Sequence, residues 1–172
     1  MGQKALAVSN DGIMTVMRTH RLGASVMAFV AYTAVMLVLE RRMRATGGPG
    51  IIPFELAGTA SRAEAIMARW GADGQRAARI STWLDFGYMT TYGILAAQLV
   101  DRARRRLGHP AALPAVVGVA VAGDAIEGVS LLKVLSGSRI AENARRARIA
   151  ARIKFAVLVV TLGYVAAGSL KR

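Results

Sequence analysis

The stretch that decides the fold is AALPAVVGVAVAGDAIEGVSLLKVL, residues 111–135. It is apolar almost throughout, and about 20 such residues suffice for an α-helix to cross the hydrocarbon core of a bilayer. Asp124 and Glu127 interrupt it three residues apart, a spacing that places both side chains on one face of a helix. A charge at mid-bilayer costs roughly 2.5–3.5 kcal/mol. The stretch therefore predicts a membrane span whose two acids have a partner or a function.

Three further apolar blocks flank this stretch, at residues 22–39, 80–100 and 153–170. The sequence is 54% hydrophobic, and its apolar residues are pooled in blocks rather than spread at amphipathic spacing. Pooled blocks of this length are typical of membrane spans. We therefore expect an all-α, integral membrane four-helix bundle that forms a single domain over residues 1–172.

Residues 40–79 form the one large segment expected outside the membrane. A short amphipathic helix is predicted from about 62 to 70 and ends at Trp70. Trp70 lies next to arginine, and Phe54 belongs to an apolar cluster in the same segment. Tryptophan is enriched at the membrane–water interface. We expect this helix to lie in the lipid headgroups, with Trp70 and Phe54 as interfacial side chains.

The net charge of +13 comes mainly from arginines just outside the apolar blocks. Cations in these positions contact lipid headgroups and set topology. This placement favours the lipid bilayer as partner over nucleic acid. Loop 101–110 is dense in arginine, which favours termini in the cytoplasm, although the total counts of Lys and Arg favour the opposite orientation.

A third acid, Asp85, lies in the block at 80–100. If this helix runs antiparallel to the next one, Asp85 lies level with Lys133, and the two can form an ion pair. Tyr88 and Tyr92 share a stripe with Asp85. This stripe is either a polar lining or, as we favour, a seam between helices in which the tyrosine hydroxyls are hydrogen-bond partners.

Three interpretations of Asp85, Asp124 and Glu127 compete. In the first, they bond to polar side chains of neighbouring helices and fix the helix register. In the second, a partner protein supplies the opposite charge. In the third, they form a pathway for protons or cations, because adjacent carboxyl groups cannot all ionise in a dry environment.

Enzymatic function is not indicated. The sequence has no cysteine, which excludes a thiolate metal site, and neither histidine lies within a span. A carboxylate di-metal site in a bundle and a serine hydrolase both need such a histidine. Gly118, Gly123 and Gly128 are interpreted as packing notches rather than as a phosphate-binding loop. We expect a non-enzymatic protein without a cofactor or a metal.

Four short motifs together resemble a known group of proteins: Phe54-Glu55-Leu56-Ala57, Trp70-Gly71, Leu84-Asp85-Phe86 with Tyr92, and Gly123-Asp124-Ala125-Ile126-Glu127. They resemble small four-span integral membrane proteins of actinobacteria, among them the LucB-like accessory subunits of mycobacterial Mce lipid-import complexes. The chain has Gly128 where these proteins favour Asn.

The resemblance implies a multi-pass protein of the bacterial plasma membrane that docks on a larger complex, such as a transporter permease, and has no catalytic site. The expected function is therefore that of an accessory subunit, with lipid import as the process it serves. The alternative is a small proton- or cation-coupled transporter that uses Asp85, Asp124 and Glu127.

Overall fold

The computed structural model describes residues 2–170, and side chains from residue 20 to 170. The described chain is helical, with no strand, and contains α1 (Gly2–Ala45), α2 (Ile51–Glu55), α3 (Ala60–Leu107), the 3-10 helix η1 (Leu113–Val116), α4 (Val117–Leu135) and α5 (Ile140–Leu170). The all-α prediction is confirmed. The helices extend well beyond the predicted apolar blocks, because helix formation continues through the flanking arginine-rich residues.

Three helical segments are long and apolar enough to cross a membrane: His20–Ala45, Leu113–Leu135 and Ile140–Leu170. They contain three of the four predicted spans. Residues 80–100 are helical but do not reach the same apolar character, because Asp85, Thr90 and Gln98 lower their mean hydropathy.

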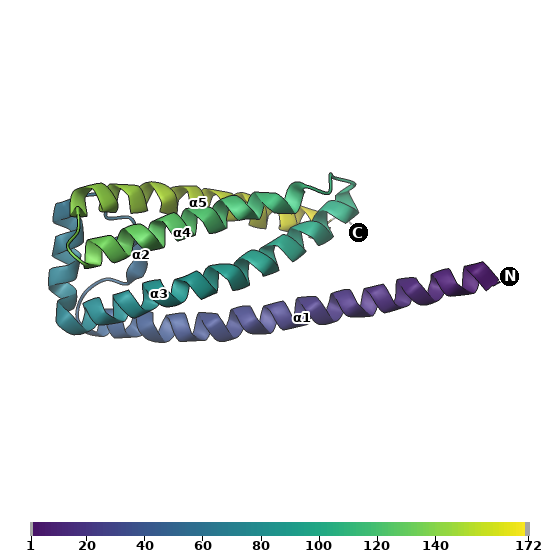
Figure 1. The fold of residues 1–172 in the computed structure, drawn as a ribbon, viewed down its shortest axis with the longest axis horizontal. Helices are drawn as coiled ribbons and strands as arrows, with labels where there is room; N and C mark the ends of the chain where they lie inside the picture. Colours follow the sequence, from purple (N-terminus) through teal and green to yellow (C-terminus); the bar gives the residue numbers. More distant parts are fainter. Residues whose placement is uncertain (1, 171–172) are drawn as a thin grey trace.

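The four long helices α1, α3, α4 and α5 run back and forth along one axis (Figure 1). Helix α1 packs against α3, whereas α3, α4 and α5 pack on one another. The first part of α3, residues 60–70, runs across one end of this bundle (Figure 1). We call the end that carries this crossing segment the capped end; the described ends of the chain lie at the other.

The direction of α3 changes at Gly71, whose φ of 58° and ψ of −163° are not helical. This backbone conformation is essentially restricted to glycine. Gly71 therefore separates the crossing segment, residues 60–70, from the long part of α3 that lies in the bundle. The predicted end of a helix at Gly71 corresponds to this break.

The main hydrophobic core lies at the capped end. Its largest side chains are Met43, Phe54 and Trp70, packed with small residues of α3 and α5. Phe54 and Trp70 are each 1% exposed, their ring centroids lie 4.9 Å apart, and Trp70 Nε1 donates a hydrogen bond to the Pro49 carbonyl at 2.6 Å. The expectation that these two side chains contact lipid headgroups is wrong, because both are packed in the core of the protein.

Helix α2 is held against the end of α1 by a carboxylate. Glu40 Oε2 accepts a hydrogen bond from the Ile51 amide at 2.8 Å, and its other oxygen pairs with Arg44 at 2.7 Å. A β-carbon at Gly50 would collide with the Glu40 side chain, so glycine permits this close approach. The result is that α2 directs Glu55, at its last position, into the bundle, where the side chain is buried.

Candidate functional site

Lys154 is the centre of a buried charged cluster. It lies on α5 and is 6% exposed. Its Nζ donates a hydrogen bond to Asp124 Oδ1 at 2.8 Å and lies 2.9 Å from Glu127 Oε2 and 3.7 Å from Glu55 Oε2. One ammonium group thus joins carboxyl groups of α2 and α4 to α5. We call Lys154, Asp124, Glu127 and Glu55 the lysine cluster.

Helix α3 joins the lysine cluster through a tyrosine. The Tyr92 hydroxyl donates a hydrogen bond to Asp124 Oδ2 at 2.7 Å. Asp124 therefore receives one bond from α5 and another from α3, and both of its oxygens have a donor. The cluster connects four helices at one level of the bundle.

The other two carboxyl groups of the cluster are less well satisfied. Glu127 Oε2 is buried and has only the Lys154 ammonium beside it, at 2.9 Å, whereas the buried Glu55 Oε2 lies 3.7 Å from that ammonium, beyond hydrogen-bond distance. No other described group donates to either oxygen. A buried carboxylate oxygen without a donor loses its hydration without full compensation. This arrangement favours a proton on at least one of the two groups.

The burial of Glu55 and the charges around it also favour its protonated form. Burial raises the pKa of Glu55 above its ordinary value of 4.5, while the nearby ammonium of Lys154 opposes this rise. The negative charges of Asp124 and Glu40 add to the rise. Glu55 therefore retains its proton to a higher pH than an exposed glutamate would.

A groove gives access to one side of the lysine cluster. Its volume is about 920 Å³, and its lining comes mainly from α1, α3 and α5, with α2 at one end. Glu55, Asp124 and Lys154 line it together with Asp85. Its remaining walls are largely apolar, formed by residues such as Phe29, Leu37, Leu95, Phe155, Leu158 and Leu162. We call this cavity the acidic groove.

Negative charge is in excess around the acidic groove. Four carboxyl groups, those of the lysine cluster and Asp85, share one ammonium, so full ionisation would leave a net charge of −3. Glu40 and Arg44 also line the groove, but they pair with each other and do not change this sum. Buried charges are tolerated only when they are paired or neutralised. The excess must therefore be neutralised by protons or by a bound cation.

The structure brings together most of the predicted site residues. Asp124, Glu127 and Tyr92 meet in or beside the lysine cluster, and Asp85 lines the same groove as Asp124. The expected ion pair between Asp85 and Lys133 does not form. Lys133 is exposed near the end of α4 and makes no ion pair among the described side chains, because Lys154 is the cation that reaches the acids.

Tyr88 belongs to a seam between α1 and α3. Its hydroxyl is 3.1 Å from Thr33 Oγ1, and its ring stacks on Phe29 with centroids 5.6 Å apart. The ring also contacts Tyr92 edge-on, with a centroid distance of 5.8 Å. Tyr88 therefore lies in a seam between helices, as predicted for the tyrosine stripe. Tyr92 instead donates its hydrogen bond to Asp124 of the lysine cluster.

Lys154 and Glu55 were missed by the sequence reasoning. Lys154 is the second residue of the block at 153–170 and directly follows the arginines of 145–152, a position where a flanking cation is ordinary. A lone lysine after a run of arginines was the available signal. Glu55 follows the apolar cluster 51–54, which the sequence places outside the membrane; in helix α2 only Phe54 and Glu55 are buried.

Comparison with protein families, curated proteins and solved structures finds no match for this chain. Among the described residues, no group of three or more His, Asp or Glu side chains has the arrangement of a metal site.

Proposed function

We propose that this protein is a non-enzymatic membrane protein that binds amphipathic cations in the acidic groove. The observation that carries the proposal is the excess of carboxyl groups at one end of a groove whose other walls are apolar. Ligand sites typically combine such apolar walls with a few polar groups that fix orientation. The volume of about 920 Å³ suits a molecule of drug or lipid-headgroup size.

The proposal places the acidic groove within the membrane. We place a fourth span at residues 80–100, because this part of α3 packs beside the apolar segments of α1, α4 and α5. The crossing segment, residues 60–70, would then lie near the headgroups at the capped end, with its apolar face toward the protein. The plasma membrane of a bacterium and the side of the termini remain expectations from the sequence.

Binding is proposed to exchange a cation for a proton. A cationic group between Asp85 and Asp124 would supply the charge that protons otherwise provide. The apolar part of the ligand would lie along Leu158 and Leu162 on α5. Lys154 stays paired with Glu127, on the side of the cluster away from the groove, and keeps the bundle assembled.

Titration calorimetry with tetraphenylphosphonium, a lipophilic monovalent cation, tests this function in detergent. Titration in two buffers of different ionisation enthalpy reports the protons released on binding. We expect binding with net proton release. Asp85→Asn or Asp124→Asn should weaken binding at least tenfold, which corresponds to a loss of about 1.4 kcal/mol of binding free energy for one charge contact.

The matched control is Asp73→Asn, which removes the same charge from an exposed position outside the groove. Its affinity should equal that of the unchanged protein. Absence of binding, or equal affinity in the Asp85 and Asp124 variants, would contradict the proposal. If the protein in liposomes also exchanges the cation for protons across the bilayer, it is the coupled transporter considered from the sequence.

A second candidate function is that of an accessory subunit of a larger membrane complex, with lipid import as the process expected from the resemblance. The supporting observation is that α1 packs on α3 at the edge of the bundle, so that a groove remains between α1 and α5. A helix of a partner protein can fill such a groove. Purification from the native membrane in mild detergent tests this candidate: a stoichiometric partner that blocks tetraphenylphosphonium binding would favour it, and recovery of the protein alone would not.

A further inference from the structure

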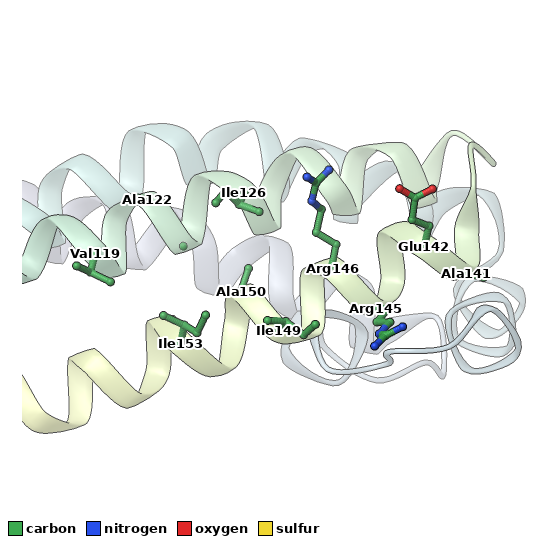
Figure 2. A pocket seen from close by; sticks show the side chains of 11 residues that line it. Val119, Ala122, Ile126, Ala141, Glu142, Arg145, Arg146, Ile149, Ala150 and Ile153 are labelled. Carbon is green, nitrogen blue, oxygen red and sulfur yellow. The ribbon is translucent and has the colours of Figure 1, made fainter.

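A second groove lies on the opposite side of α5 from the acidic groove, between α4 and α5. Its volume is about 710 Å³. The side walls are branched apolar residues, Val119 and Ile126 on α4 and Ile149 and Ile153 on α5. Figure 2 shows Arg145, Arg146 and Glu142 toward one end of this groove and Val119 and Ile153 toward the other. We call it the outer groove.

Small residues bring the two helices together along the outer groove. A β-carbon at Gly123 would lie 3.3 Å from the Ala150 carbonyl oxygen, which is tighter than ordinary contacts. Gly123 and Ala150 therefore form a low floor between the taller isoleucine walls. The floor and side walls of this part of the groove are therefore apolar.

The arginines of the outer groove form no ion pair in the part of the chain whose side chains are described. Neither Arg145 nor Arg146 has an acidic partner within 4.0 Å among the described side chains. Glu142, the one acid of the groove, lies 3.7 Å from Arg139. The polar end of the groove thus carries net positive charge, even with Glu142 counted.

Arg145 and Arg146 lie just outside the apolar part of α5. Arg146 is seven residues before Ile153, which corresponds to roughly 10 Å along a helix. Ile153 begins the apolar part of α5, so the arginines lie at the level expected for lipid phosphate groups. The apolar walls extend from there toward the hydrocarbon.

We propose that the outer groove binds an anionic phospholipid. Its phosphate contacts Arg145 and Arg146, and one acyl chain lies along Ile149 and Ile153 against Val119. Charge complementarity selects this occupant over a second copy of the chain, because a two-fold contact through this groove would place the net positive ends of both copies in one interface at the same depth of the membrane. The inference depends on α4 and α5 being membrane helices and is independent of the proposed cation binding.

Fluorescence quenching by lipids with brominated acyl chains tests the proposal. The variant Ile153→Trp places an indole on the outer groove, and the unchanged protein gives the background from Trp70 and Trp83. In mixed vesicles, we expect brominated phosphatidylglycerol to quench the new tryptophan more strongly than brominated phosphatidylcholine at the same mole fraction. Arg145→Gln with Arg146→Gln should reduce this preference by up to about 25-fold, since each basic residue near an anionic lipid contributes about a fivefold effect.

The matched control is Arg41→Gln with Arg42→Gln, an adjacent exposed pair near the same end of the bundle that does not line the outer groove. It removes the same charge and should preserve the preference, as should replacement of Arg145 and Arg146 by lysine. Equal quenching by the two lipids, or equal losses in both glutamine pairs, would overturn the proposal. Protection of the new tryptophan from both lipids would also overturn it, because protein would then cover the groove.

Discussion

At the scale of single residues, Lys154 determines whether the buried acids are tolerated. Removal of one partner from a buried ion pair typically costs about 3–5 kcal/mol, because the remaining charge has no compensation. We expect Lys154→Met to lower the free energy of unfolding in detergent by about this amount. Lys133→Met is the control, with an expected change within about 0.5 kcal/mol because Lys133 is exposed.

Thermal unfolding followed by circular dichroism measures both variants. If the loss reflects unpaired carboxylates, adding Asp124→Asn to Lys154→Met should restore part of the stability, because Asn keeps a polar group for Tyr92 and removes a charge. A single variant as stable as the unchanged protein would show that the acids do not need this ammonium.

Glu55 predicts how stability depends on pH. Its pKa in the folded protein lies above its ordinary value of 4.5, so the folded state binds more protons than the unfolded state. The contribution of Glu55 to stability is therefore greatest below pH 4.5 and falls as the pH rises toward the folded pKa. Lys154, Glu127, Asp124 and Glu40 all face this carboxyl group and modulate the shift.

Melting temperatures of Glu55→Gln and the unchanged protein, measured from pH 4.5 to 8, test this reasoning. The variant should lose less stability as the pH rises, because a neutral amide needs no proton. Glu64→Gln serves as the control, since Glu64 is exposed on the crossing segment. Parallel curves for all three proteins would contradict the assigned role of Glu55.

At the scale of elements, the break at Gly71 positions the crossing segment. An added β-carbon would meet no neighbour within 4 Å, so any effect of Gly71→Ala comes from the backbone conformation alone. We expect this substitution to destabilise the protein by about 1–3 kcal/mol. Gly163→Ala is the control, because this glycine lies inside a helix and also has open space around it. This substitution should increase the free energy of unfolding by about 0.5–1 kcal/mol. Chemical unfolding in detergent measures both, and a stabilising Gly71→Ala would show that the break is not required.

Hydropathy located the helices but not their ends or their packing. Apolar blocks reveal where a helix meets hydrocarbon, whereas α1, α3 and α5 continue through polar residues that carry no such signal. Of the packing notches predicted at Gly118, Gly123 and Gly128, those at Gly123 and Gly128 are confirmed by their contacts with α5 and with Phe86. The prediction for Gly118 is wrong, because a β-carbon there would meet no neighbour within 4 Å. On α5, Gly163 has open space around it, whereas Gly168 packs against Ala103 of α3.

The acids of the site were predictable, whereas their cation was not. A carboxyl group inside an apolar block is conspicuous, and Asp124 and Glu127 were found on this basis. Lys154 lies at the edge of its block, where flanking cations are ordinary. Only the three-dimensional arrangement shows that α5 carries it beside α4 rather than to the surface. Depth within the bundle depends on how the helices are staggered, and composition does not encode this.

At the scale of the whole molecule, the groove between α1 and α5 distinguishes this protein from a closed bundle. The sequence contains no cysteine, so single thiols can be introduced without background. Ala96→Cys places a thiol on the α3 lining of the acidic groove, and Ile94→Cys places one on an exposed face of the same helix.

If the groove binds an amphipathic cation, tetraphenylphosphonium should slow alkylation of the thiol at position 96 by N-ethylmaleimide in detergent. The thiol at position 94 should react at the same rate with and without the cation, because it lies outside the groove. Protection should disappear when Asp124→Asn is added to Ala96→Cys, since the cation then loses a carboxylate. Equal slowing at both positions would indicate a general effect of the cation on the detergent or the protein. Equal rates at position 96 would mean that the ligand does not occupy the space between α1 and α5.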